Sequence, residues 1–281
     1  MKSPHSATIA APEAAARGAA AGGDRDALMI ELLPWATSFA RVPVSGFEVG
    51  AVVLGRSGAL YAGANLEFAG LPLSTSVHAE QAAVSNAWLH GEVGIDALAV
   101  NAEPCGACRQ FVNELHGASA LRILVPRATA ATLAALLPAP FGPGDLGVEA
   151  GLLNRADHGL RADERSGDAT ADALLDAALA AANASYAPYT RAYAGVALRL
   201  RDGTIVSGRY AECAAFNPSL PALQAALSAL ALRRADPSAI ADAVLAEAAG
   251  ATSQRASAAA ILGALAGIPL RYAAATPRPN Q

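Results

Sequence analysis

Two short stretches, His-Ala-Glu at residues 78–80 and Pro-Cys-Gly-Ala-Cys at residues 104–108, carry the chemistry around which the fold is organised. They offer one imidazole and two thiols as metal ligands, from His78, Cys105 and Cys108. Cys and His are the usual ligands of zinc, and a site with three protein ligands keeps a fourth position open for water. An open position is typical of a catalytic site. The pattern therefore predicts a catalytic zinc site with one ion per chain.

The two cysteines have two alternative interpretations, a structural zinc site and a redox-active pair. A structural site requires a fourth Cys or His, and the nearby His90 and His116 are expected at helix ends, where solvated histidines are common. A redox pair leaves His78 and Glu80 without a role. A carboxylate that lies beside the metal without binding it can carry protons, and Glu80 is the candidate for that role in the motif.

Composition excludes several classes of protein. The chain has 281 residues, of which 53% are hydrophobic and 16% charged, so it can build a large core. A net charge of −4 gives no general attraction to nucleic acid or to an anionic membrane. Three cysteines make no disulfide framework, and no apolar run is long enough for a signal peptide or a spanning helix. We therefore expect a cytoplasmic protein that binds neither nucleic acid nor membrane.

Hydrophobic spacing in the first half predicts alternating strands and helices. We expect a helix over 28–40, strands over 47–54 and 60–66, a helix over 77–90, a strand over 95–100, a helix over 104–115, a strand over 121–125 and a helix near 130–137. This order predicts a mixed sheet covered by helices. Ligands in such sheets bind where strand ends meet helix starts, which is where both parts of the motif fall.

The second half repeats the first faintly. Three glycines of each half align at one constant spacing, namely Gly50, Gly58 and Gly63 with Gly195, Gly203 and Gly208. A little further on, Pro221 stands in the position of His78, and Leu223 in that of Glu80. No second Cys-x-x-Cys follows. The second half is therefore predicted to be a degenerate copy that keeps the apolar framework and has lost its chemical groups.

The motif, the length and the duplication together resemble the bacterial two-domain, homodimeric cytidine deaminases, from about residue 28 onward. The pattern H-x-E…P-C-x-x-C is a signature of the zinc-dependent nucleobase deaminases. Residues 63–68 (Gly-Ala-Asn-Leu-Glu-Phe) and 141–143 (Phe-Gly-Pro) extend the similarity. The resemblance implies an α/β fold of two three-layer α/β/α domains with mixed sheets, the second without a metal site. The expected division is a flexible leader (1–26), a catalytic domain (27–155), a linker (156–168) and a degenerate domain (169–281).

The implied activity is hydrolytic deamination of cytidine and 2′-deoxycytidine to uridine and 2′-deoxyuridine, with release of ammonia, in pyrimidine salvage. Zinc lowers the pKa of a bound water to about 7, which supplies hydroxide for attack at C4. Glu80 would be the proton shuttle. By the same resemblance, Asn65 and Glu67 bind the ribose hydroxyl, the Ala79 amide meets the pyrimidine carbonyl, Phe47 packs on the base, and Phe141 enters the site of the neighbouring subunit.

Two positions depart from the family pattern, and two other functions compete with this one. Ala102 stands where the family has an aromatic residue, and Ala107 where it often has a polar one, so the packing of the pocket is expected to differ. A deaminase of polynucleotides would need a basic groove and aromatic stacking platforms, whereas this chain is acidic and 5% aromatic. A non-catalytic zinc-stabilised scaffold would be expected if His78 or Glu80 were lost.

Overall fold

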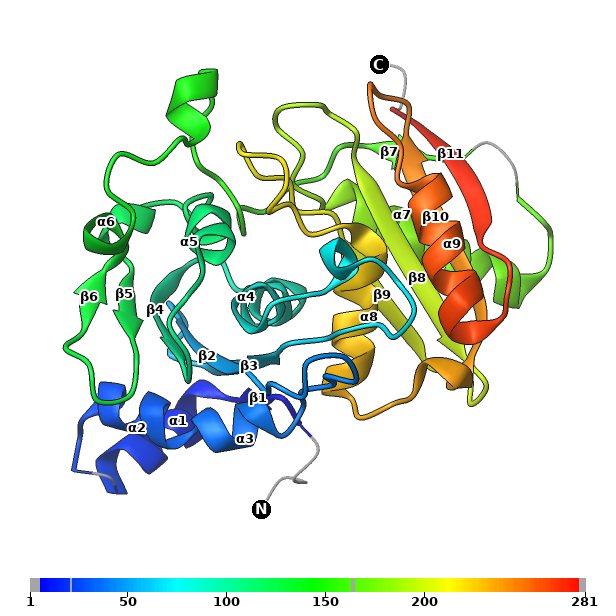
Figure 1. Ribbon diagram of the computed structural model, residues 1–281. Helices are drawn as coiled ribbons and strands as arrows, with labels where there is room; N and C mark the ends of the chain where they lie inside the picture. The colour runs from blue at the N-terminus through cyan, green and yellow to red at the C-terminus, as the bar shows by residue number, and fades with distance from the viewer. Residues whose placement is uncertain (1–5, 21, 163–164, 278–281) are drawn as a thin grey trace.

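The computed structural model describes residues 6–20, 22–162 and 165–277. Two β-sheets stand side by side with helices between them and on their outer faces (Figure 1). The first sheet has the order β1-β3-β2-β4-β5-β6 and the second β7-β11-β10-β8-β9. The first sheet comprises β1 (Thr8–Ile9), β2 (Gly50–Gly55), β3 (Leu60–Ala64), β4 (Ile95–Val100), β5 (Arg122–Leu124) and β6 (Ala131–Thr132). The second comprises β7 (Leu160–Arg161), β8 (Ala194–Leu200), β9 (Ile205–Arg209), β10 (Ile240–Ala248) and β11 (Arg271–Pro277).

Both sheets are mixed. In the first sheet β2 pairs antiparallel with β3 and with β4, whereas β4 and β5 are parallel. The second sheet repeats this pattern, because β8 pairs antiparallel with β9 and β10, and β10 runs parallel to β11. We call the first sheet with helices α1 to α6 the first domain, and the second sheet with α7 to α9 the second domain. The mixed α/β architecture predicted from the sequence is confirmed.

The helices of the first domain are α1 (Ala11–Ala20), α2 (Arg25–Glu31), α3 (Leu33–Thr37), α4 (Ala79–Leu89), α5 (Gly106–Val112) and α6 (Leu133–Leu136). Those of the second are α7 (Ala169–Asn183), α8 (Ala222–Leu232) and α9 (Arg255–Ala266). Short 3₁₀ turns lie at Leu73–Thr75, Ala118–Ala120, Pro143–Leu146 and Pro237–Ala239.

Helices α4 and α8 lie between the two sheets and bury their sides in one hydrophobic core that both domains share (Figure 1). The outer face of the first sheet is covered by α1 to α3, and that of the second by α7. Burial of apolar surface stabilises a fold by roughly 25 cal/mol per Å², so this shared core joins the two domains strongly.

The repeated glycines explain how closely strand and helix approach in each domain. A Cβ atom on Gly63 of β3 would lie 2.1 Å from the backbone nitrogen of Ala83 in α4. A Cβ atom on Gly208 of β9 would lie 2.2 Å from the backbone nitrogen of Ala226 in α8. Real Cβ atoms do not come this close to a backbone atom. Glycine is therefore required at both positions by the same contact.

Two expectations for the N-terminal region need correction. The single helix expected over 28–40 is divided into α2 and α3 at Leu32, because Pro34 has no N–H to continue a helix and stands in the first turn of the next. The leader expected over 1–26 contains β1, which pairs with β3, and α1, which buries Ala14. Ala7, Ile9 and Ala14 of this segment are buried in the hydrophobic cluster on the outer face of the first sheet. Residues 1–5 and 21 lie outside the described residues.

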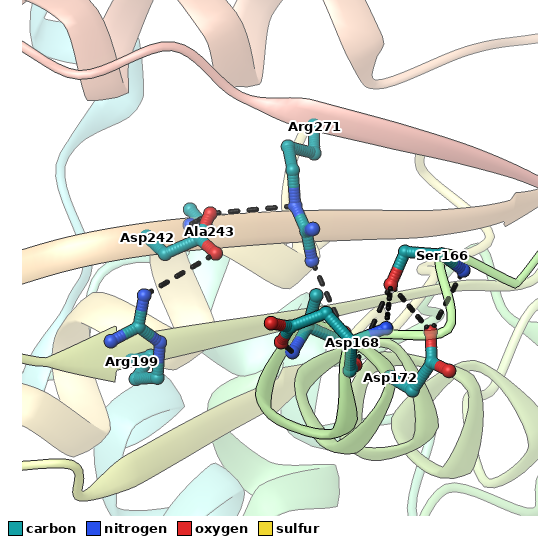
Figure 2. A network of polar contacts seen from close by, with 8 residues as sticks. Ser166, Asp168, Asp172, Arg199, Asp242, Ala243 and Arg271 are labelled. Carbon is teal, nitrogen blue, oxygen red and sulfur yellow. Dashed lines mark hydrogen bonds and ion pairs between the residues drawn. The ribbon is translucent and has the colours of Figure 1, made fainter.

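The expected linker, 156–168, is also partly ordered into the fold. Its residues Leu160–Arg161 form β7, which pairs antiparallel with β11. At its end Ser166 donates a hydrogen bond of 2.9 Å to Asp172, and Asp168 accepts one of 2.8 Å from the Ala171 N–H, which caps α7 (Figure 2). Residues 163–164 lie outside the described residues.

Neighbouring side chains extend this polar network across the second sheet. Asp242 of β10 lies between Arg199 of β8, at 3.6 Å, and Arg271 of β11, at 3.4 Å (Figure 2). Arg271 also donates to the Ala171 carbonyl of α7 at 3.3 Å. The network therefore fastens three strands and a helix to one another on the face opposite the shared core.

Candidate metal centre and substrate site

The three expected metal ligands come together where two helices begin. His78 is the N-cap of α4 and Cys105 is the N-cap of α5, with Cys108 in the first turn of α5. His78 Nδ1 lies 3.4 Å from Cys105 Sγ and 3.3 Å from Cys108 Sγ. Ligands of a tetrahedral zinc ion at about 2.3 Å for sulfur and 2.0–2.1 Å for nitrogen would lie about 3.5 Å apart. The donor set and its spacing therefore fit zinc.

The position of His78 is fixed by the start of its helix. Its backbone N–H donates to Oε1 of Gln81 at 3.1 Å, which closes the first turn of α4. Cys108 is buried, whereas His78 and Cys105 are exposed, so the open side of the group faces outward. Within the described part of the chain, no other group of His, Cys, Asp and Glu has this geometry.

Each thiol changes the pKa of the other, in opposite directions. A hydrogen bond from Cys108, followed by one from His78, lowers the pKa of Cys105 to about 3. The same bond to Cys105, together with burial, raises the pKa of Cys108. The bond to Cys105 also raises the pKa of His78. A thiolate is therefore available at neutral pH, which is the form of cysteine that binds metal.

Glu80 is in the first turn of α4, two residues after His78, and is 4% exposed. Burial raises the pKa of its carboxyl above the ordinary value. A carboxyl whose pKa is moved toward neutrality exchanges protons more readily at neutral pH. Glu80 lies outside the group of three expected ligands.

Asn65 and Glu67 follow β3 and hold the segment that carries Phe47. The Asn65 side chain accepts from the Val49 N–H at 2.9 Å and donates to the Phe47 carbonyl at 2.9 Å. The Glu67 carboxylate accepts from the N–H groups of Val44 and Ser45, each at 2.9 Å. It also accepts from the Ser45 hydroxyl at 2.5 Å.

We call this arrangement of Glu67 with Val44 and Ser45 the carboxylate clamp. Ser45 was not predicted from the sequence, although it stands two residues before Phe47, the aromatic residue expected to pack on the base. The clamp presents Phe47 at the surface, where 63% of this side chain is exposed. The Phe47 ring is therefore accessible from solvent.

The remaining expected residues lie nearby on α4 and in the chain after α6. Ala79 is the first residue of α4, where backbone N–H groups have no partner within the helix. The Phe141 carbonyl accepts a hydrogen bond of 2.6 Å from the Gln110 side chain of α5, and the Phe141 side chain is 50% exposed. Ala102 is half-buried, and Ala107 borders a cavity beside His78.

That cavity has a volume of about 510 Å³ and is lined by both domains. Its second-domain wall contains Tyr210, Glu212 and Pro221, which are the positions aligned with Asn65, Glu67 and His78. Phe47, Asn65 and Glu67 are not among its lining residues. The cavity therefore occupies the place of the degenerate site, with His78 of the first domain at its edge.

The degenerate site keeps one feature that the sequence interpretation missed. Glu212 accepts from the N–H groups of Tyr189 and Thr190 and from the Thr190 hydroxyl, which repeats the carboxylate clamp. The expectation that the copy had lost every chemical group is therefore wrong for this glutamate. Its metal ligands are replaced, and the N-cap residue Gln254 of α9 instead accepts from the Ala222 N–H of α8 at 2.9 Å.

Both halves of the chain match the same family of known proteins. Two family models, both described as the cytidine and deoxycytidylate deaminase zinc-binding region, match residues 24–123 and 133–260. The chain is 46% identical over 260 residues to a cytidine deaminase of Photorhabdus laumondii, covering 92% of this chain and 86% of that one. A cytidine deaminase of Klebsiella pneumoniae is 48% identical over 252 residues, covering 89% of this chain and 83% of its own length.

A crystal structure of cytidine deaminase from Mycobacterium tuberculosis aligns with 41% of this chain and 96% of that chain. Its sequence identity to this chain is 34% and its TM-score is 0.38. Within the described residues, no helix combines the length and apolar character needed to cross a membrane.

Proposed function

Because the chain belongs to the zinc-binding cytidine and deoxycytidylate deaminases, we propose that Glu80 moves the protons in its hydrolytic deamination of cytidine. Cytidine is the substrate of this enzyme and zinc its cofactor. The observation that carries the proposal is a buried carboxyl two residues from His78, outside the three-ligand group. We extend the same reaction to 2′-deoxycytidine and place it in pyrimidine salvage in the cytoplasm.

Zinc held by His78, Cys105 and Cys108 would activate water for attack at C4 of the pyrimidine. The protons of this water must reach two places for the reaction to balance. One goes to N3 as the new C–O bond forms, and one goes to the amino group, which leaves as ammonia. Glu80 can accept each proton and give it up again, since burial holds the pKa of its carboxyl above the ordinary value.

The residues expected from the sequence offer the groups that a nucleoside requires. We propose that Phe47 packs on the base and that the Ala79 N–H donates to the pyrimidine carbonyl. Asn65 and Glu67 would bind the ribose hydroxyl. Their side chains already form hydrogen bonds to the segment that carries Phe47, and they would use their remaining donor and acceptor positions for the hydroxyl. The clamp on Glu67 uses three bonds, and a carboxylate accepts about four.

We further propose that two copies of the chain form a homodimer and complete each other's sites through Phe141. Two large apolar residues of the expected site are exposed, Phe47 at 63% and Phe141 at 50%. We infer that a second copy of the chain covers them. A symmetric dimer would bury the same patch on both copies.

The test compares Glu80→Ala with Glu103→Ala, which removes an exposed carboxylate next to the Pro-Cys-x-x-Cys motif. We expect Glu80→Ala to keep about one zinc per chain and to lose about 10²- to 10⁴-fold in kcat with cytidine. Glu103→Ala should resemble the wild type in both zinc content and kcat.

Three results would contradict the proposal. If Glu80→Ala retained zinc and full turnover, another group would carry the protons. If the wild type retained zinc but left cytidine and deoxycytidine unchanged, a scaffold role would be favoured. Equal turnover of cytidine and of single-stranded DNA would favour a polynucleotide deaminase.

A further inference from the structure

One buried carboxylate of the first domain is bonded entirely by the second. Glu114 follows the last turn of α5 and is 1% exposed. It accepts hydrogen bonds from the Tyr186 hydroxyl at 2.9 Å, the Tyr189 hydroxyl at 2.6 Å and the Ala214 N–H at 2.8 Å. All three donors belong to the second domain. Glu114 therefore fastens the end of α5 to the domain that has no metal site.

The chemistry of these donors makes the connection strong. Burial, and then the charge of Glu114, raise the pKa of the Tyr186 hydroxyl. Burial also raises the pKa of the Tyr189 hydroxyl, with the bond to Glu114 as the next cause. Both phenols therefore keep their protons at neutral pH and remain donors. Hydrogen bonds to an ionised acceptor are about twice as strong as neutral ones, and they are stronger still away from water.

The geometry of α5 carries this connection to the metal centre. The helix has seven residues, with Cys105 at its N-cap and Cys108 in its first turn. Glu114 comes six residues after Cys108 and directly follows Asn113, the C-cap of the helix. A shift of its C-terminal end would be transmitted to both cysteines.

Helix α4 has a comparable connection. The Gln81 side chain accepts from the His78 N–H and donates to the Pro218 carbonyl of the second domain at 2.8 Å. Both helices that present metal ligands are thus hydrogen-bonded to the second domain within a few residues of those ligands. Their mutual position, and with it the spacing of imidazole and thiols, depends on the domain without a metal.

We propose that Glu114 is a positioning residue, which fixes α5 on the second domain so that Cys105 and Cys108 meet His78 at the spacing zinc requires. This inference rests on the zinc ligands of the proposed function. It gives the degenerate domain a role in metal retention. Outer residues that orient metal ligands typically change metal affinity 10- to 100-fold when they are replaced.

The experiment measures zinc release from the zinc-loaded full-length protein into a colorimetric chelator. The variant is Glu114→Gln, which keeps the shape of the side chain but cannot accept all three bonds. The matched control is Glu247→Gln, in a glutamate that is also 1% exposed and accepts from the Ser253 hydroxyl and the Gln254 N–H within the second domain. Both variants should lower the melting temperature.

We expect zinc release about 10-fold faster for Glu114→Gln than for the wild type, and release by Glu247→Gln at the wild-type rate. A second variant, Tyr186→Phe with Tyr189→Phe, removes two donors, keeps the carboxylate and is expected to release zinc faster as well. It provides the test if Glu114→Gln does not fold.

If Glu114→Gln and the double tyrosine variant released zinc at the wild-type rate, the positioning role would be wrong, even if the melting temperatures of both variants fell. Equally fast release by Glu114→Gln and Glu247→Gln would also overturn it, since general destabilisation would then be the cause. A wild-type protein that held no zinc would overturn the proposed function together with this inference, so the two failures are distinguishable.

Discussion

At the scale of single residues, the carboxylate clamp shows how a side chain expected to meet substrate also builds the site. Glu67 binds the backbone and hydroxyl of Ser45, and the Ser45 hydroxyl oxygen in turn accepts from the Phe47 N–H at 3.0 Å. The clamp therefore extends from the end of β3 to the aromatic residue that we place on the base. Its strength determines how firmly Phe47 is held before substrate arrives.

Protonation would weaken the clamp only in acid. Burial by itself would raise the pKa of Glu67, but the hydrogen bonds from Ser45 and Val44 outweigh burial and lower it below its ordinary 4.5. A carboxyl with a lowered folded-state pKa stabilises the fold above its unfolded pKa, and this contribution is lost as pH falls through the folded value. The clamp is therefore complete at neutral pH.

Ser45→Ala tests whether the clamp matters for binding. It removes a hydroxyl that bonds Glu67 at 2.5 Å and Phe47 at 3.0 Å. A lost hydrogen bond of this kind costs about 1 kcal/mol, and we expect KM for cytidine to rise about fivefold with little change in kcat. Steady-state kinetics at neutral pH provide the measurement.

Ser57→Ala is a closely matched control. The Ser57 hydroxyl donates to Glu92 at 2.5 Å and accepts from the Ala59 N–H at 3.2 Å, in the turn between β2 and β3. Its loss should lower stability by a similar amount and leave KM unchanged. The binding role of the clamp would be refuted if both variants raised KM equally.

At the scale of elements, the sequence predicted most of the first domain because its helices and strands follow simple hydrophobic periods. The strands β2 to β5 and the helices α4 and α5 lie within a few residues of their expected positions. The expected metal ligands could be foreseen from the motif, and His78 and Cys105 fall at the starts of the two helices that follow β3 and β4. The prediction was wrong in the first 40 residues, because an Ala-rich segment shows no clear hydrophobic period and Pro34 divides a helix.

Contacts between elements remote in sequence were also beyond prediction. Glu114 carries no motif, and its partners Tyr186, Tyr189 and Ala214 come from another domain. Spacing along one chain does not indicate which side chains meet across a domain boundary. The repeat of the clamp at Glu212 could have been found by continuing the alignment of the two halves past Gly63 and Gly208.

Gly63→Ala tests the contact between β3 and α4. The new methyl group would lie 2.1 Å from the Ala83 nitrogen and 2.4 Å from the Ala79 oxygen, so backbone must move. Overpacking of this kind costs about 3 kcal/mol. We expect a large fall in the free energy of unfolding, and a fall in kcat because α4 carries Glu80.

Two further glycines control for this substitution. Gly208→Ala makes the equivalent clash with α8, and should cost similar stability while the remaining folded protein keeps its KM. Gly263→Ala in α9 meets nothing within 4 Å and should stabilise the helix by about 0.5–1 kcal/mol. If Gly63→Ala were as harmless as Gly263→Ala in chemical denaturation, the close approach of β3 and α4 would be wrong.

At the scale of the whole molecule, the proposed dimer predicts that two damaged variants restore activity when they pair, which is impossible in a monomer. If Phe141 acts in the partner's site, each site combines Glu80 of one chain with Phe141 of the other. Phe141→Ala and Glu80→Ala then remove residues that different chains supply to the same site. Mixed dimers would contain one site with both residues intact. Random pairing in a symmetric dimer should restore about a quarter of wild-type activity.

The measurement is cytidine turnover by the two variants after co-expression, compared with each variant alone. Mixing already purified dimers without exchange serves as the control and should give only the sum of their activities. Activity after co-expression that remained at this sum, with mixed dimers demonstrated by tagging, would show that Phe141 acts within its own chain.

The shared core between the sheets has a consequence for how this chain can diverge. After a gene duplication, selection on a second metal site relaxes as soon as one site suffices, and His can become Pro at position 221. No such freedom exists at Gly208, which is required by the same contact as Gly63. The second half can therefore lose its metal ligands, but it must keep the residues that pack strand against helix.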